Sequence, residues 1–308
     1  MGAPIEDLYH RLGYGSVRVL GQGMEGQVHD LGQGRVGKAW AWRTEGELRA
    51  LAAFYEELAA QDLPWDSPRI LAVHRDGDRV VSIERRLHGT ALSTASGSGQ
   101  VGLEQARACV QQVVADLDAT RAGPATRALA VLDQGAGLRR AGRTWGRDLA
   151  ALVAERVHRF APALRAALPD LDAVAAQVVA ALEHLEAGPE RIVHGDLCPE
   201  NILVDEHGRV SAVLDWGFFT TAGDGAFDAA TAAGFFDMYG PRAREHEEAM
   251  LEAFAARGWD RELMALYRAA YGLAGANAYS DEGDDGHFAW CVAALDRPQV
   301  RRALQRRA

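Results

Sequence analysis

The chain of 308 residues has few cysteines, one lysine and no long apolar run. A membrane helix needs roughly 20 apolar residues, and no segment approaches that length. The first residues also lack the basic-then-apolar order of a signal peptide, so we expect a cytoplasmic protein. Cys109, Cys198 and Cys291 are far apart and form no CxxC pair. This spacing argues against a zinc site and against a disulfide framework.

Charge is the second bias of the composition. Lys and Arg number 33 and Asp and Glu number 43, giving a formal net charge of -10. This charge argues against a nucleic-acid backbone as a partner and is compatible with a cationic ligand. Hydrophobic residues make up 48% of the chain and charged residues 25%. This balance predicts a globular protein with a substantial core, and the length suits two domains.

The only lysine is Lys38, so the other 32 of the 33 basic residues are arginine. Lysine carries a compact charge on a flexible stem, whereas the guanidinium of arginine is a planar fork. A chain that keeps one ammonium suggests a position that arginine cannot fill. The alternative is that this lysine has survived by chance.

The hydrophobic pattern divides the chain into an N-terminal and a C-terminal part. Short strands broken by glycine occupy residues 17–41, a helical pattern begins at Thr44, and two further strands surround the turn at residues 76–78. Residues 1–86 therefore predict a small antiparallel sheet with one helix. Residues 87–100 read as a hinge and linker. Residues 101–308 are mainly helical, with a strand-rich interruption at 192–215, so the fold class is α+β.

The segment from Val193 to Asn201 carries the strongest chemical signal. Asp196 lies five residues before Asn201, and Asp215 follows an apolar strand fourteen residues after Asn201. Phosphoryl transfer needs a carboxylate for the attacking hydroxyl and oxygen ligands for Mg²⁺. Each residue could singly be a turn-forming Asp or Asn, but their joint spacing favours the catalytic interpretation.

Residues 193–201 and the segment around Asp215 resemble the catalytic and metal-binding loops of the aminoglycoside phosphotransferases, which are relatives of protein kinases. In this family His-Gly-Asp, here ending at Asp196, replaces the His-Arg-Asp of protein kinases. The resemblance implies a two-lobed, protein-kinase-like fold. It also implies that Asp196 is the catalytic base and that Asn201 and Asp215 bind magnesium.

The resemblance extends to the N-terminal part. Gly21, Gly23 and Gly26 fit the kinase glycine loop, whose backbone N–H groups approach phosphates. The loop precedes Lys38, which by resemblance contacts the α- and β-phosphates of ATP.

A carboxylate of the following helix should hold Lys38. Glu47 fits this role best. The segment from Thr44 to Glu47 is also a capping box. In that case Glu45 becomes the candidate partner of the lysine.

By the same resemblance, the hinge places the adenine edge against the backbone C=O of Arg85 and the N–H of Leu87. Ile70 and Leu203 are candidates to sandwich the base, or ordinary core residues. His194 is expected to brace the catalytic loop through the backbone rather than to carry a proton.

Other residues of the motif region have expected structural roles. Asp228 is expected to tether the catalytic loop from the start of a helix, and the nearby Asp224 belongs to the same motif. Gly225 stands where the family usually has proline. We assign no chemistry to Cys198.

The acceptor is the least determined part of the site. Carboxylates of the second lobe hold cationic acceptors in this family, and the candidates here are Asp148, Asp237, Asp284 and Asp285, together with Glu155, Glu245, Glu248, Asp281 and Glu282. Each could equally lie on a solvated face. Aromatic residues could line the site; they are Trp145, Phe235, Phe236, Tyr239 and Trp290.

These features predict an enzyme that transfers the γ-phosphate of ATP or GTP, with Mg²⁺, to a hydroxyl of a small cationic antibiotic such as an aminoglycoside. Alternatives are a kinase for a macrolide or a basic cyclic peptide, or a kinase for an amino alcohol, sugar or homoserine-like metabolite. A nucleotide-binding pseudokinase would not need all four of Lys38, Asp196, Asn201 and Asp215. No A-P-E-like anchor follows Asp215, which disfavours a protein kinase. The expected partners are a nucleotide and a small acceptor, without nucleic acid or membrane, in a monomer or dimer.

Overall fold

The computed structural model describes residues 5–23 and 26–307, and the chain divides into two compact units. Unit 1 comprises Met1–Ala91 and Ile202–Leu214, and unit 2 comprises Leu92–Asn201 and Asp215–Ala308. The first border lies close to the predicted end of the N-terminal part. The segment Ile202–Leu214, which the sequence placed with the C-terminal part, packs instead with unit 1.

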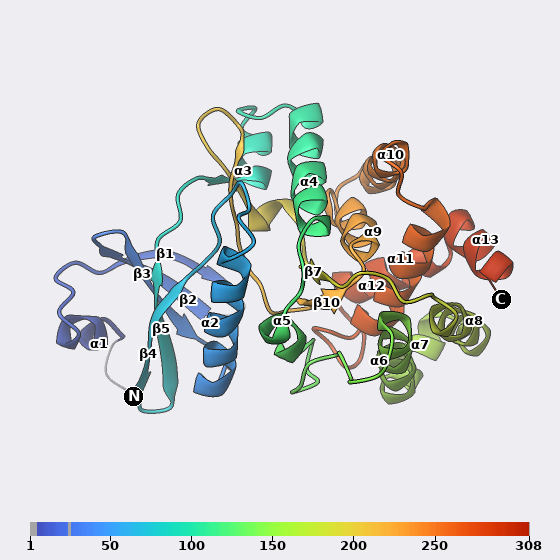
Figure 1. Cartoon of the computed structure of the whole chain (residues 1–308), viewed down its shortest axis with the longest axis horizontal. Coiled ribbons are helices and arrows are strands. Elements are labelled where there is room, and N and C mark those ends of the chain that lie inside the picture. The colour runs from blue at the N-terminus through green and yellow to red at the C-terminus, as the bar shows by residue number, and fades with distance from the viewer. Residues whose placement is uncertain (1–4, 24–25, 308) are drawn as a thin grey trace. The chain divides into compact units, whose positions relative to one another are not determined.

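Unit 1 is built on a five-stranded sheet in the order β1-β2-β3-β5-β4 (Figure 1). The strands are β1 (Arg18–Gly23), β2 (Gly26–Gly32), β3 (Arg35–Trp40), β4 (Ile70–Asp76) and β5 (Arg79–Arg85). Every neighbouring pair is antiparallel. The predicted antiparallel sheet is therefore confirmed.

Two helices accompany this sheet. Helix α2 (Glu45–Ala59) buries Leu48, Leu51, Phe54 and Leu58, whose spacing gives it one apolar face. Helix α1 (Ile5–Arg11) was not predicted, because seven residues are too few to show a helical period. It brings the buried Tyr9 into the sheet's core beside Leu31, Val81 and Ile83.

A second, three-stranded sheet of unit 1 has the order β6-β8-β9. Its strands are β6 (Thr90–Ala91), β8 (Ile202–Val204) and β9 (Val210–Val213). The turn between β8 and β9 closes on Asp205, whose carboxylate accepts the N–H groups of His207 and Arg209 at 2.9 Å. These strands confirm part of the strand-rich interruption predicted at residues 192–215.

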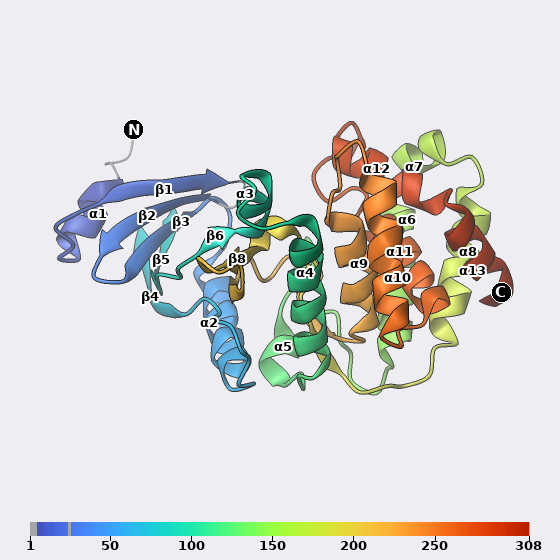
Figure 2. The ribbon, with the colours of Figure 1, turned by 90° about the horizontal axis from the view of Figure 1, so that it is seen from above.

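Unit 2 is mainly helical, as Figure 2 shows. Its helices are α3 (Leu92–Gly97), α4 (Leu103–Asp118), α5 (Pro124–Ala128), α6 (Trp145–Arg159), α7 (Ala161–Ala167), α8 (Leu171–Glu183), α9 (Ala226–Phe235), α10 (Ala243–Ala256), α11 (Arg261–Gly275), α12 (Gly286–Leu295) and α13 (Pro298–Arg307). Helix α11 is the centre of the unit, since it packs against α6, α9, α12 and α13 and is buried on all sides from Met264 to Gly275.

Two short strands of unit 2 support the chemistry-bearing loops. β7 (Arg191–Val193) pairs antiparallel with β10 (Thr221–Gly223). The 3-10 helix Pro199–Asn201 follows β7. The predicted catalytic loop therefore follows β7, and the predicted metal-binding loop leads into β10, the strand that pairs with β7. Across residues 5–23 and 26–307, no helix combines the length and apolarity needed to cross a bilayer.

Candidate active site

The loop after β7 makes a sharp turn at Gly195. This residue has a φ of +74°, and a Cβ placed on it would lie 2.5 Å from the Cβ of Phe219. Only glycine avoids both the backbone strain and the clash. The middle residue of His194-Gly195-Asp196 is thus fixed by the close approach of the segment that follows Asp215.

Asp228 holds this turn from the first turn of α9. Its two carboxylate oxygens accept the backbone N–H groups of His194 and Gly195, each at 2.8 Å. The side chain is buried, and burial raises the pKa of Asp228 to about 7, although the two N–H groups favour the charged form. The predicted tether is confirmed.

His194 links the catalytic loop to the segment after Asp215. Its Nδ1 accepts the N–H of Asp196 at 3.2 Å, so the predicted role as a backbone brace is confirmed. Its ring lies 4.3 Å from the ring of Trp216, centroid to centroid. The hydroxyl of Thr220 donates to the carbonyl of His194 at 3.1 Å and accepts the N–H of Gly217 at 2.8 Å. Thr220 could not be singled out from the sequence, because one hydroxyl among core residues carries no local signal.

Asn201 is directed at Asp196 by its amide group. Its Nδ2 donates to the backbone carbonyl of Asp196 at 2.9 Å and lies 3.5 Å from the carboxylate oxygen Oδ2. Since Nδ2 is committed to Asp196, the other amide atom, Oδ1, is the one suited to a metal. The predicted base and one predicted metal ligand are therefore adjacent.

Asp215 is exposed and has an unusual backbone. Its φ is +62°, a left-handed value that few non-glycine residues adopt. Such strain persists where the surroundings enforce it, and it clusters at functional sites. The residues after Asp215 are held to the catalytic loop, because the Trp216 ring contacts that of His194 and Gly217 is linked to the His194 carbonyl through the hydroxyl of Thr220.

The donor chemistry of Asn201 and Asp215 fits magnesium. One amide oxygen and one carboxylate are hard oxygen ligands, and Mg²⁺ is usually held by one or two carboxylates together with substrate phosphates and water. Within the described residues, no group of three or more His, Cys, Asp or Glu side chains forms a candidate metal cage. Asn201 and Asp215 thus offer donor types that suit an ion held jointly with substrate phosphates.

Cys198, between Asp196 and Asn201, is a neutral thiol. Burial is the main reason that its pKa is raised, and the carboxylates of Asp196 and Glu200 raise it further. A thiol needs to ionise to act as a nucleophile. This environment agrees with assigning no chemistry to it.

Lys38 belongs to unit 1, on β3. Its neighbour Gly37 packs against Tyr9, since a Cβ there would lie 2.4 Å from the tyrosine ring. Side chains alternate along a strand, so Lys38 points to the face opposite α1. There its Nζ lies 3.7 Å from the ring centroid of Trp40. That Lys38 meets the groups of unit 2 at one nucleotide stays a prediction.

The glycine motif connects β1 and β2. Gly26 is required by packing, because a Cβ would lie 1.9 Å from the carbonyl oxygen of Ala39. Apart from their chain neighbours, no described atom lies within 4 Å of a Cβ placed on Gly21 or Gly23, which suits a backbone that approaches phosphates. Met24 and Glu25, between these glycines, lie outside the described residues. The predicted role of the loop in nucleotide binding stays a prediction.

The candidate partners of Lys38 are both engaged at the start of α2. Glu47 completes the capping box: its carboxylate accepts the N–H and the hydroxyl of Thr44 at 2.7 Å, and its N–H donates to the Thr44 oxygen. Glu45 pairs with Arg49 at 2.5 Å. The alternative raised by the sequence, that Glu47 serves as a cap, is therefore realised here.

The predicted adenine-binding residues also lie in unit 1. Arg85 ends β5, its N–H donates to the carbonyl of Arg69, and its side chain pairs with Asp66 at 2.8 Å. Leu87 follows in the connection to β6. Ile70 begins β4 and Leu203 lies in β8. Their contacts with a base stay predictions.

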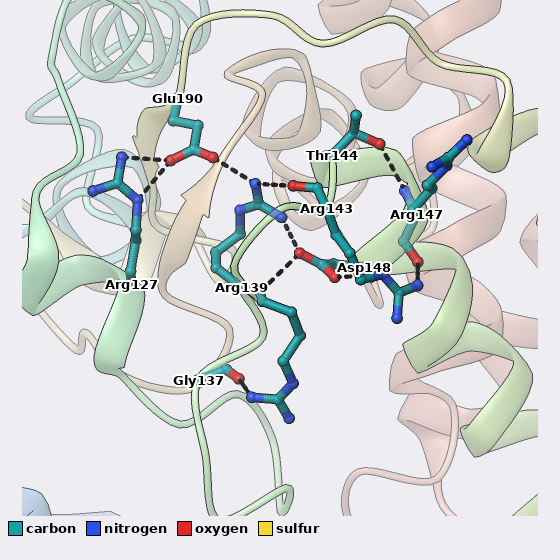
Figure 3. A network of polar contacts seen from close by, with 9 residues as sticks. Arg127, Gly137, Arg139, Arg143, Thr144, Arg147, Asp148 and Glu190 are labelled. Atoms are coloured by element: carbon teal, nitrogen blue, oxygen red, sulfur yellow. Dashed lines mark hydrogen bonds and ion pairs between the residues drawn. The ribbon is translucent and has the colours of Figure 1, made fainter.

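Asp148 is not available to an acceptor, and the expectation that it binds one is wrong. Figure 3 shows its carboxylate held by Arg139 and Arg143, while Arg139 also reaches Glu190. The Asp148 side chain is 1% exposed and that of Arg139 6%. Pairing with guanidinium groups offsets part of the cost of burying a carboxylate. Asp148 therefore fastens α6 to the segment that precedes β7.

The other acidic candidates lie nearer the surface. Asp237 follows α9, Asp284 accepts the hydroxyl of Ser280 at 2.6 Å, and Asp285 caps α12 by accepting the N–H of Phe288 at 2.7 Å. Among the aromatic candidates, Trp145, Phe235 and Trp290 are core residues. Tyr239 is 68% exposed. Of this aromatic set, it is the side chain best placed to touch a solute.

A family model described as "Phosphotransferase enzyme family" matches residues 37–267, a span that includes Lys38, the catalytic loop and Asp215. The chain belongs to this family. It is accordingly a phosphotransferase, and the predicted relationship and kinase-like fold are confirmed. A search of curated proteins gives no match by sequence.

Solved structures agree with this phosphotransferase in fold. Aminoglycoside phosphotransferase APH(3'')-Id from Streptomyces rimosus, also solved with ADP and streptomycin, has a TM-score of 0.56 at 18% identity over 87% of this chain and 96% of its own. Macrolide 2'-phosphotransferase MphH from Brachybacterium faecium has a TM-score of 0.55 at 22% identity, over 96% and 98%. The structures of similar fold therefore include both an aminoglycoside and a macrolide phosphotransferase.

Proposed function

We propose that this phosphotransferase moves the γ-phosphate of ATP or GTP to a hydroxyl of a small cationic antibiotic. The observation that carries the proposal is the Asn201 amide bonded to Asp196 in a loop held by Asp228. Family membership supports the reaction class. The similar structures bound to nucleotide and antibiotic support the donor and the acceptor class.

Within this proposal, Asp196 orients the attacking hydroxyl and accepts its proton as the new O–P bond forms and the bond between the γ-phosphorus and the departing nucleoside diphosphate breaks. The Asn201 amide keeps the Asp196 loop in place, and Asn201 and Asp215 would hold the metal. Mg²⁺, when bound, neutralises charge on the β- and γ-phosphate oxygens. Lys38 and the glycine loop would hold the phosphates from unit 1. The net charge of -10 suits a cationic acceptor.

The acceptor is identified by incubating the protein with Mg-ATP or Mg-GTP and a panel of compounds. The panel contains streptomycin, kanamycin, a macrolide, a basic cyclic peptide and an amino alcohol. Transfer adds about 80 Da, one HPO₃ unit, to the acceptor. Phosphorylation of the amino alcohol alone would replace the proposal by a metabolic kinase. Nucleotide binding without transfer to any member would favour a binding module.

The role of Asp196 is tested by Asp196→Ala. We expect turnover to fall by about 10²–10⁴-fold, with ATP affinity nearly unchanged, because the residue acts on the acceptor proton. Glu200→Ala is the matched control, an exposed carboxylate of the same loop. It should leave turnover within about 2-fold. Equal losses in the two variants would remove Asp196 from the chemistry.

A further inference from the structure

Large hydrophobic side chains are rarely exposed in this protein. In the described part of unit 2, two of them stand out: Tyr239, 68% exposed, and Tyr279, 47% exposed. Single exposed aromatics are ordinary, whereas grouped apolar side chains at the surface are typical of binding sites. The two tyrosines can form one binding surface only if their rings lie close together.

Both tyrosines meet the beginning of α12. The Tyr239 ring, from the segment after α9, lies 3.7 Å from the position of a Cβ on Gly286. The Tyr279 ring packs edge-on against His287, with centroids 5.0 Å apart. Gly286 and His287 are the first two residues of α12. Two separate loops thus bring one exposed aromatic ring each to the same helical turn.

Tyr279 also reaches the metal-binding segment. Its ring stacks on Phe218 at 5.8 Å, with 9° between the ring planes, and Phe218 is three residues beyond Asp215. The aromatic pair is therefore joined by direct contact to the loop that carries a predicted magnesium ligand.

The loop that carries Tyr279 is ordered by its own hydrogen bonds. Nδ2 of Asn277 donates to the carbonyls of Ser280 and Asp281 at 3.0 and 3.1 Å. The hydroxyl of Ser280 donates to Asp284, and Asp285 caps α12. An exposed ring on a fixed loop loses little entropy when it binds a ligand.

The surroundings of both rings are negative. After burial, the carboxylates of Asp196 and Asp215 contribute to raising the pKa of Tyr279, and Cys291, Asp285 and Asp196, in that order, contribute to raising that of Tyr239. Both rings therefore lie within the field of several carboxylates. A tyrosine face attracts a cation, and nearby carboxylates add to this attraction.

We propose that Tyr239 and Tyr279 form an aromatic clamp that binds the ammonium group of the acceptor through the ring faces, beside the reacting hydroxyl. The inference rests on the proposed function for its ligand, and it names residues that decide which acceptors bind. An alkylated ammonium, whose charge is spread over its carbon substituents, is the chemistry that such a clamp recognises.

The test uses protein labelled with 3-fluorotyrosine and two probes of the same shape. Choline carries a quaternary ammonium, and 3,3-dimethylbutan-1-ol is its neutral isostere. Tyr239→Phe and Tyr279→Phe each remove one ¹⁹F signal and so assign it. The other five of the seven tyrosines are internal controls.

We expect choline to shift the Tyr239 and Tyr279 signals saturably, and the neutral isostere to bind about 5-fold more weakly. Shifts of all tyrosines alike, equal binding of both probes, or no shift would each overturn the clamp. The measurement needs neither nucleotide nor turnover, so it succeeds or fails independently of the kinase proposal.

A kinetic readout follows once the panel has identified an acceptor. Tyr279→Ala should raise the acceptor KM about 10-fold and leave the nucleotide KM unchanged, whereas Tyr279→Phe keeps the ring face and should restore the acceptor KM. Thermal melting verifies that both variants fold. An unchanged acceptor KM in a folded Tyr279→Ala variant would overturn the inference alone.

Discussion

At the scale of single residues, arginine serves inside the protein as well as on its surface. The buried Arg156 donates to the carbonyls of Ala274 and Asn277 at 2.9 and 3.1 Å and pairs with Asp133. A planar fork with several fixed donors can join three acceptors at once, which a lysine ammonium does less well. The preference of this sequence for arginine over lysine therefore extends to the core, where one guanidinium group satisfies several acceptors.

A second buried group centres on Glu247 in α10. Its carboxylate lies 3.4 Å from Nε of Arg268 and pairs with Arg297. The Arg268 guanidinium also lies 3.6 Å over the ring of Trp290. Burial lowers the pKa of Arg268 to about 10, which is still charged at neutral pH. Glu247 is the anion that offsets two buried cations.

We therefore expect Glu247→Gln to lower the free energy of unfolding by about 3–5 kcal/mol, because it leaves both guanidinium groups without an anion. The next residue provides the control. Glu248 pairs with Arg261 at the surface, so Glu248→Gln should cost less than about 1 kcal/mol. Urea unfolding at neutral pH measures both, and similar losses would contradict the assignment of Glu247.

At the scale of elements, α12 carries a titratable group in its first turn. His287 is buried, its Nε2 lies 3.5 Å from Sγ of Cys291, and its ring faces Tyr271 and Tyr279. Burial lowers the pKa of His287 to about 4, with Asp285 opposing the shift and Arg268 adding to it. The folded protein therefore excludes a proton that the unfolded chain binds.

This difference makes stability depend on pH. The unfolded histidine titrates near pH 6.5 and the folded one near pH 4, so the contribution of His287 is intact above about pH 6.5 and is lost as the pH falls toward 4. In His287→Gln this loss is absent, so the stability advantage of the wild type should shrink by up to about 3 kcal/mol between pH 7 and 4. Urea unfolding of both proteins across that range measures it, and a constant difference would refute the burial argument.

The carboxylate of Glu47, at the start of α2, has two alternative roles: it caps the helix or it pairs with Lys38. Since Glu47 is exposed and bonded to Thr44, we expect Glu47→Gln to leave the nucleotide KM near the wild-type value, because glutamine also completes a capping box. Thr44→Ala should lower the free energy of unfolding by about 1 kcal/mol. A large rise in the nucleotide KM for Glu47→Gln would instead establish the pair with Lys38.

The sequence predicts the elements better than their partners. The strands, the helix after Thr44 and the two loops follow from local patterns, and so does the brace by His194. The burial of Asp148 could not be predicted, since Arg139, Arg143 and Glu190 follow no period with it. Tyr279 was missed for the same reason: its stacking partner Phe218 is distant in the chain.

At the scale of the whole molecule, the single lysine permits a direct test of the nucleotide site. An amine-reactive ATP analogue has two targets, Lys38 and the terminal amine. We expect peptide mapping to find the label on Lys38, and excess ATP to suppress it there, because the phosphates guide the analogue to the ammonium. Labelling of Lys38 that ATP does not suppress would remove this residue from the site, and Lys38→Arg provides the unlabelled control.

The division into two units also determines where the chain can be truncated or recombined with related proteins. The chain enters unit 1 for a second time between Asn201 and Asp215, so the hairpin of β8 and β9 is encoded far from β6, the strand that β8 joins. A truncated protein ending at residue 91 would contain β6 without its partner β8. The unpaired strand edge would favour aggregation. Domain-swap chimaeras with related kinases must therefore exchange the internal segment along with the N-terminal one.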